Sequence, residues 1–218
     1  MHNFISIEGI EGCGKTTQIR LLEQALKAEH IPILLTREPG GCAIADKIRS
    51  ILLDPCNTEM VPTTELLLYA AARAQHVEEV IRPALMHGKV VICDRFTDAT
   101  MAYQGYGRGL GHKTIDALAH LACAGIEPGL TLWLDLPVEV GVKRALERNK
   151  TQQTSTEARF DQESMQFHAR VQVGYAQLQR QYPQRIKRVA ADASPEVVAA
   201  RILALVREHL RSKSSHRP

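Results

Sequence analysis

A glycine-rich segment near the N-terminus has the residue types of a phosphate-binding loop. Gly9 and Gly14, with four residues between them, are followed directly by Lys15 and Thr16. In such a segment glycines let backbone N–H groups turn inward around a phosphate, the lysine reaches the β/γ oxygens of a nucleotide, and the hydroxyl can ligate Mg²⁺. A chance glycine-containing turn is the alternative, but a strand-like run precedes the segment and a helical pattern follows it. We therefore assign nucleotide binding to Gly9, Ile10, Glu11, Gly12, Cys13, Gly14, Lys15, Thr16 and Thr17.

A second polar group follows another apolar run. Asp94 and Arg95 come directly after Val90–Cys93. Because the carboxyl ends of parallel strands meet at one edge of a sheet, both side chains are expected where the glycine loop opens. Arg95 is then placed to meet the phosphate of an acceptor, and we take Asp94 with Thr16 as candidate metal ligands. The alternative is an ordinary ion pair at a strand end.

Further candidates follow the second strand or lie on helices. Residues 37–41 occupy the same edge of the sheet, and Arg49 lies on a helix. Tyr69 and Arg73 are four residues apart and share a helix face, so the pair could stack on a base and donate to its carbonyl. The alternative is a core ring beside a surface cation.

Short apolar runs that alternate with helical patterns predict the elements that position these residues. The expected strands are Phe4–Glu8, Ile33–Leu35, Val90–Ile92, Leu130–Leu134 and a run around Ile186–Val189. A helix follows the glycine loop, and others are expected near 43–53, 63–87, 113–124, 137–149, 163–182 and 195–210. Strands apolar on both faces belong in a covered parallel sheet. We predict one α/β domain over 1–211 with three α/β/α layers and about five parallel strands. The polar stretch Asn149–Glu157 reads as a mobile loop, and 212–218 as a disordered tail.

Composition limits the class of protein. The 218 residues include 27 basic and 24 acidic side chains, too even a balance to predict a nucleic-acid surface. Apolar runs are too short to cross a bilayer, so no membrane partner and a cytoplasmic location are expected. The five scattered cysteines show no C-x-x-C pair, which disfavours a disulfide framework or a zinc site. Cys13 either carries a reactive thiolate, favoured by the helix N-terminus and Lys15, or packs its sulfur inside.

A phosphate-binding loop does not by itself decide how a nucleotide is used. No guanine-reading Asn-Lys-x-Asp segment is present, which disfavours a switch GTPase. A small-molecule kinase needs a second anion site facing the loop and a cover that excludes water, and residues 94–95 and 149–162 are candidates for these parts.

Five segments together resemble bacterial thymidylate kinases, and the resemblance runs from end to end. They are Glu8–Thr17, Thr36–Gly41, Asp94–Phe96, Ala102–Gly105 and Arg159–Glu163. The resemblance implies a P-loop nucleoside-monophosphate kinase fold, transfer of a phosphoryl group from Mg-ATP to thymidine monophosphate (dTMP) for dTTP synthesis, and a homodimer. A kinase of the same fold with another small acceptor, and a nucleotide-dependent switch or scaffold, remain the alternatives.

The resemblance also implies roles for single residues. Glu11 lies near the acceptor sugar and its phosphate, and Glu38 in the loop that frames the acceptor and its metal. The positions that bind the acceptor phosphate and the pyrimidine are Arg49, Arg73 and Arg95. Tyr69 is at the position that stacks on the base. The residues that line the deoxyribose and base side are Thr100, Tyr103 and Gln104.

The glycine loop contains no arginine, as in family members whose catalytic cation comes from the lid. Arg144 and Arg148 are assigned to ATP, and Arg159 to catalysis with Lys15 and Arg95; a solvated lid charge is the alternative for Arg159. Three positions depart from the family pattern and put secondary hydrogen bonds in doubt. They are Phe96, Ala99 and Ala158.

Overall fold

Five parallel strands form the centre of the protein in a computed structural model that describes residues 1–151 and 159–212. The sheet order is β2-β3-β1-β4-β5. Apolar and β-branched side chains dominate these strands, as the burial of both faces requires. The strand bounds are β1 Phe4–Glu8, β2 Ile33–Arg37, β3 Val90–Asp94, β4 Leu130–Asp135 and β5 Ile186–Ala190.

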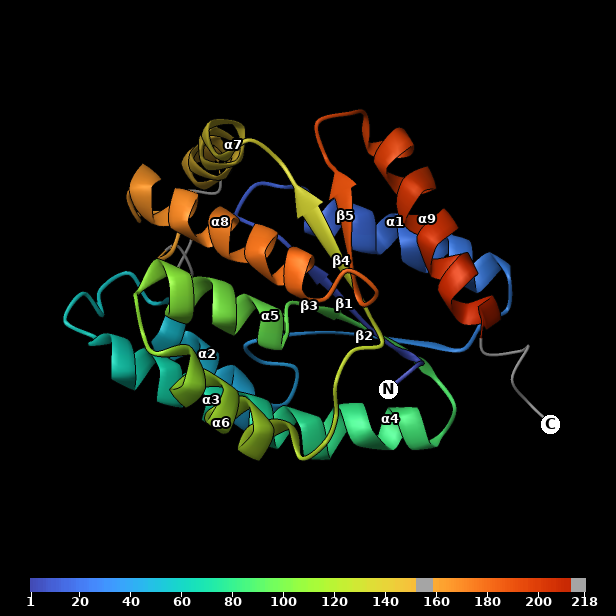
Figure 1. The fold of residues 1–218 in the computed structure, drawn as a ribbon, viewed down its shortest axis with the longest axis horizontal. Coiled ribbons are helices and arrows are strands. Elements are labelled where there is room, and N and C mark those ends of the chain that lie inside the picture. The colour runs from blue at the N-terminus through green and yellow to red at the C-terminus, as the bar shows by residue number, and fades with distance from the viewer. Residues whose placement is uncertain (152–158, 213–218) are drawn as a thin grey trace.

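Helices cover both faces of this sheet, which confirms the three-layer α/β/α prediction. Helices α1 and α9 lie together on one side, and α3, α4 and α6 lie on the other (Figure 1). The helix bounds are α1 Lys15–Ala28, α2 Ala43–Leu53, α3 Pro62–His76, α4 Arg82–Met86, α5 Thr97–Thr100, α6 His112–Cys123, α7 Val138–Thr151, α8 Met165–Gln181 and α9 Pro195–Ser212. Two π-helical segments, η1 Val77–Ile81 and η2 Met101–Gly107, join α3 to α4 and continue α5.

The strand register sets the position of the polar loops. Ile7 of β1 pairs with Asp94 of β3, and Glu8 pairs with Trp133 of β4. The glycine loop after β1 and the residues after β3 therefore leave the sheet side by side, as the sequence predicts.

Two helical regions differ from the sequence prediction. The expected helix at 63–87 contains the π-helical segment η1, and Pro83 follows it at the start of α4, where its missing N–H breaks the regular ladder. The segment 97–107 was expected to carry site residues but not to be helical. It forms α5 and η2 because it packs along α8, and this packing outweighs the weak helix propensity of its glycines and threonines.

Part of the predicted lid and tail lies outside the described residues. Helix α7 extends to Thr151, and residues 152–158, which include the Ala158 departure, are not described. Phe160 and Asp161 at the end of the predicted lid are buried. The first residue of the predicted tail, Ser212, belongs to α9 instead, and its hydroxyl donates to the His209 carbonyl. Residues 213–218 lie outside the described residues.

Candidate active site

The glycine loop joins β1 to α1 through three residues with positive φ. Gly9, Gly12 and Gly14 have φ of 141°, 70° and 95°, values that side chains with a Cβ rarely adopt. Gly14 stands at the N-cap of α1, so the loop ends where free helical N–H groups begin. Such a terminus favours an anion.

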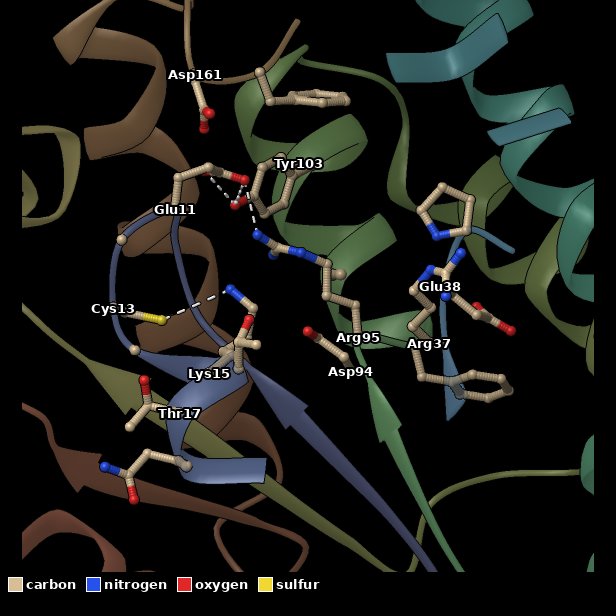
Figure 2. A pocket seen from close by; sticks show the side chains of 18 of the residues that line it. Glu11, Cys13, Lys15, Thr17, Arg37, Glu38, Asp94, Arg95, Tyr103 and Asp161 are labelled. Carbon is tan, nitrogen blue, oxygen red and sulfur yellow. Dashed lines mark hydrogen bonds and ion pairs between the residues drawn. The ribbon is translucent and has the colours of Figure 1, made fainter. Parts of the chain in front are cut away.

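Lys15 is folded back into this loop. Its side-chain nitrogen donates to the carbonyls of Gly9 and Ile10 at 3.0 and 3.1 Å, and it lies 3.7 Å from the Cys13 sulfur (Figure 2). Cys13 itself is buried, with 3% of its surface exposed. The amine therefore sits where a bound phosphate would meet it, while the thiol faces the interior of the loop.

Helix α7 presses directly on the glycine loop. A Cβ placed on Gly141 would lie 2.7 Å from the Glu11 carbonyl oxygen, and one placed on Gly12 would collide with the Gly141 backbone. Both glycines are therefore required for this close approach. The same helix carries Arg144 and Arg148.

Arg95 crosses from β3 to the glycine loop. Its φ of 68° is in the left-handed region, and its backbone N–H donates to the Ile7 carbonyl at 3.0 Å. Its guanidinium donates to the Gly9 carbonyl at 2.8 Å and to Glu11 at 2.7 Å. A strained backbone held by several contacts is typical of functional sites.

Glu11 collects hydrogen bonds from the opposite wall. The Tyr103 hydroxyl lies 2.8 and 2.7 Å from its two carboxylate oxygens, next to the contact with Arg95 (Figure 2). Burial alone would raise the pKa of Glu11, but the positive charge of Arg95, the neighbouring His168 side chain and the charge of Lys15 lower that pKa well below its usual range. Glu11 is therefore a carboxylate at neutral pH.

A second buried carboxylate lies after β2. Glu38 accepts from Arg73 Nε at 2.7 Å, and His76 Nδ1 lies 3.0 Å from its other oxygen. Arg73 also donates to Thr100 at 2.9 Å and lies over the Phe96 ring, 5.0 Å from its centroid. Burial would lower the pKa of Arg73, but the Glu38 charge raises it.

A third buried carboxylate, Glu65, pairs with two arginines away from the glycine loop. Glu65 accepts from Gln104 at 2.8 Å and from two arginines, Arg108 at 3.1 and 3.2 Å and Arg159 at 2.5 Å. Burial raises the pKa of Glu65, but the arginines outweigh it and lower the pKa. Arg159 also donates to the Leu52 carbonyl. The residue expected to serve catalysis is thus bound away from the glycine loop.

One cavity of about 740 Å³ runs between the glycine loop and these clusters. Most of the predicted site residues line it, which brings the donor and acceptor candidates together. They are Glu11, Gly12, Cys13, Gly14, Lys15, Thr16, Thr17, Glu38, Arg49, Tyr69, Arg73, Asp94, Arg95, Thr100, Tyr103, Gln104, Arg144 and Arg148. Gly9, Ile10 and Arg159 do not line it.

The individual contacts of the remaining candidates are compatible with this arrangement. Arg49 donates to the Pro39 carbonyl at 2.8 Å, and Arg148 donates to Asp161 at 2.9 Å. The Tyr69 ring lies 6.4 Å from Phe160, centroid to centroid, and burial raises the pKa of its hydroxyl. Tyr69 is therefore a neutral aromatic wall, and Arg49 and Arg148 add positive charge to the cavity.

The candidate metal ligands Thr16 and Asp94 both offer oxygen atoms, the ligand type that Mg²⁺ prefers. Asp94 Oδ1 is a buried oxygen without a hydrogen-bond partner among residues 1–151 and 159–212, and Asp94 and Thr16 both line the cavity. Within the same residues no group of three His, Cys, Asp or Glu side chains could hold a metal. Mg²⁺ usually takes one or two protein oxygens and fills its shell with phosphate oxygens and water. Thr16 and Asp94 fit that pattern.

The polar residues of this region that were not predicted from the sequence include Glu8, Glu65, His76, Arg108 and His168. Glu65 and His76 share a helical face with Tyr69 and Arg73 at spacings of four, four and three, so periodicity alone held a signal for them. Glu8 and His168 carried no such signal, because their partners come from distant segments. Glu8 accepts from the Phe96 N–H at 2.7 Å and from the Tyr175 hydroxyl at 3.0 Å.

Comparisons with known proteins agree on one family. The family model described as thymidylate kinase matches residues 7–202. Thymidylate kinases from Geotalea daltonii and Geotalea uraniireducens are 62% and 55% identical, over 80% and 93% of this chain and 82% and 95% of their own lengths. A crystal structure of thymidylate kinase from Ehrlichia chaffeensis has a TM-score of 0.75 at 30% identity and covers 93% of this chain and 97% of its own. Separately, no helix in the described part of the chain is long and apolar enough to cross a membrane.

Proposed function

The chain belongs to the thymidylate kinase family of enzymes, and from that premise we propose that it transfers the γ-phosphoryl group of ATP to dTMP, giving dTDP. The observation that carries the proposal is the shared cavity, in which Lys15 and the helix α1 terminus face Arg73 and Arg95. Two anion-binding groups that line one cavity suit two phosphate-bearing substrates. Phosphoryl transfer needs alignment and charge neutralisation rather than a protein nucleophile.

The donor end binds the phosphates of ATP. The turned glycines, the free N–H groups of α1 and Lys15 take the β- and γ-phosphates, and Arg144 and Arg148 add positive charge from α7. Thr16 and Asp94 would hold Mg²⁺ at this end, and the bound ion would supply charge neutralisation for the phosphate oxygens. The buried oxygen of Asp94, which lacks a partner in the described chain, supports this assignment.

The acceptor end orients dTMP. Arg95 and Arg73 take its phosphate, with Arg49 beside them, and the Glu38 carboxylate holds Arg73 in place. Tyr69 and Phe160 provide an aromatic wall for the base, and Gln104 and Thr100 provide polar groups at its edge. Glu11 and Tyr103 face the sugar.

Arg159 serves as a catalytic cation only after it exchanges its pair with Glu65 for the transferring phosphoryl group. Removing it should lower kcat while leaving both substrates bound, because a cation used at the transition state adds little in the ground state. We expect Arg159→Ala to show this split, whereas Arg144→Ala, on the cavity wall, should also weaken ATP binding. A loss in Arg159→Ala that is wholly in ATP affinity would contradict the assignment.

An assay of ADP release with a series of nucleoside monophosphates tests the function. Turnover with dTMP well above that with the adenine, guanine and cytosine monophosphates is expected. A better rate with another acceptor would favour a different kinase of the same fold. Slow turnover that does not depend on any acceptor would favour a nucleotide-dependent switch. A homodimer and a cytoplasmic location stay predictions; sedimentation velocity of the purified chain tests the dimer.

A further inference from the structure

His168 on α8 is a buried imidazole that the proposed reaction does not use. Its side chain is 1% exposed, and neither ring nitrogen has a hydrogen-bond partner among residues 1–151 and 159–212. A buried polar atom without a partner is destabilising, so a histidine at such a place calls for an explanation. The only carboxylate within ion-pair distance in the described chain is Glu11, whose Oε2 lies 3.4 Å from His168 Nδ1.

The cation that pairs with Glu11 is Arg95, and the proposed function also needs Arg95 to bind the acceptor phosphate. Arg95 donates to Glu11 with one terminal nitrogen and to the Gly9 carbonyl with the other. The acceptor phosphate needs the same guanidinium. A dianion that draws Arg95 toward itself weakens the Arg95–Glu11 pair and leaves a buried carboxylate with less compensation, which is unfavourable.

We propose that His168 is a positioning residue: it takes up a proton from the solvent when the acceptor phosphate engages Arg95, and it then donates from Nδ1 to Glu11. The inference rests on the proposed function, because it requires an acceptor phosphate at Arg95. The exchange keeps Glu11 ionised and keeps it on the Tyr103 hydroxyl while Arg95 turns to the substrate. A shift of a few tenths of an ångström would bring the present 3.4 Å contact into hydrogen-bond range.

Few other groups near Glu11 could compensate its negative charge when Arg95 binds the acceptor phosphate. Lys15 lowers the pKa of Glu11 but is tied to the Gly9 and Ile10 carbonyls and is needed at the donor phosphates. The titratable and charged groups that surround Glu11 and His168 come from each neighbouring element. They are Glu8 of β1, Lys15 of α1, Asp94 at the end of β3, Arg95 after it, Tyr103 of η2, Arg144 and Arg148 of α7, Asp161 before α8, and Tyr175 of α8. Among these, Glu8 has its pKa raised to about 8, so the test must separate Glu8 from His168.

Proton uptake on dTMP binding is the direct readout. Calorimetric titrations at pH 8, in two phosphate-free buffers of different ionisation enthalpy, give the number of protons bound with the ligand. The phosphate of dTMP is already doubly ionised at this pH, since its second pKa is about 6, so it contributes no proton. We expect an uptake approaching one proton in the wild type and a much smaller uptake in His168→Gln. His87→Gln, which changes an exposed histidine, is the matched control and should retain the wild-type count.

The pH dependence of dTMP affinity gives a second readout that a purely structural role would not move. Uptake of one proton with the ligand makes dTMP affinity fall by up to about tenfold for each unit by which the pH rises. The wild type and His87→Gln should show this fall, and His168→Gln should bind dTMP with a flatter profile. Glu11→Gln removes the carboxylate charge that favours protonation of His168, so this variant should also lose the proton uptake. It provides a second test if His168→Gln does not fold.

Each outcome decides the matter. Equal proton counts in the wild type and His168→Gln, or no uptake in the wild type, would overturn the role of His168 while leaving the proposed function intact. Failure of the wild type to bind dTMP would remove both. Loss of uptake in Glu8→Gln but not in His168→Gln would assign the proton to Glu8 and would also overturn the inference.

Discussion

At the scale of single residues, the cavity is organised by carboxylates that each hold an arginine. Glu11 holds Arg95, and Glu38 holds Arg73. Because Glu38 fixes the Arg73 guanidinium before a substrate arrives, little side-chain entropy of Arg73 remains to be lost when a phosphate binds. Preorganisation of this kind is the main contribution a protein makes to phosphoryl transfer.

Lys15→Ala and Arg95→Ala should impair different substrates. Charged hydrogen bonds contribute about 1.5–3 kcal/mol, so each variant should raise one KM by roughly 10- to 100-fold. Lys15→Ala should act on ATP, because the lysine lies in the glycine loop, and Arg95→Ala on dTMP. Steady-state kinetics with each substrate varied checks this division, and equal effects on both KM values in both variants would contradict it.

Glu8 gives a prediction about pH and stability. Complete burial, followed in effect by the Asp98 charge, raises its pKa to about 8. The folded state then holds a proton that the unfolded chain releases above its ordinary pKa of 4.5. The stabilisation from this proton is complete below pH 4.5 and is lost as pH rises to about 8.

Glu8→Gln retains the shape and an acceptor for the Phe96 N–H but does not ionise. The melting temperature of this variant relative to the wild type should therefore rise between pH 5 and pH 8. One pKa unit corresponds to about 1.4 kcal/mol, and 1 kcal/mol to about 2–4 °C for a chain of this size. A relative gain of several degrees is expected by calorimetry. A constant difference across this range would mean that Glu8 is ionised throughout.

Sequence patterns found most of the residues that line the cavity, because they follow strand ends or fit a spaced motif. They did not find Glu8 or His168. Nothing local distinguishes Glu8 from any other residue at the end of a strand, and its partners Phe96 and Tyr175 become neighbours only through the fold. The pairing of Arg159 with Glu65 was missed for the same reason.

At the scale of elements, helix α7 packs directly against the phosphate-binding glycine loop. Helix α7 carries Arg144 and Arg148 and meets the glycine loop where Gly141 faces Gly12. Hydrophobic periodicity predicted α7, but it gave no hint that the approach to the loop needs a residue without a Cβ. The helical segment 97–107 was missed because packing against α8, rather than intrinsic propensity, stabilises it.

Gly141→Ala tests this contact, since two effects of opposite sign compete. Alanine in a helix interior is favoured over glycine by up to about 1 kcal/mol. Here its Cβ would lie 2.7 Å from the Glu11 carbonyl oxygen and 2.8 Å from Ile10 Cδ1, so either α7 or the loop must move. We expect weaker ATP binding and a lower melting temperature.

The matched control is Leu146→Ala, which changes an exposed residue of the same helix. It should alter stability by less than about 0.5 kcal/mol and leave ATP affinity unchanged. If Gly141→Ala instead raised the melting temperature with normal ATP binding, the loop would not depend on this close approach.

At the scale of the whole molecule, the parallel sheet places two anion sites at one edge, and one cavity of about 740 Å³ joins them. The alternation of strands and helices was sufficient to predict this arrangement. The size and continuity of the cavity were not predictable, because they depend on side chains from segments far apart, such as Arg49, Phe160 and Val198.

A continuous cavity predicts how the two nucleotides stabilise the fold together. A ligand that binds only the native state raises stability by RT ln(1 + [L]/Kd), so ADP and dTMP at separate ends should give additive increases in melting temperature. ADP replaces ATP to prevent turnover. A compound that joins adenosine and thymidine 5′-to-5′ through an oligophosphate should exceed that sum at equal concentration, because the two ends then bind as one ligand. Lys15→Ala should lose the ADP increase and Arg73→Ala the dTMP increase, and both should weaken the joined compound. If ADP and dTMP displaced one another, or if the joined compound gave no more than ADP alone, the two ends would not form a single substrate cavity.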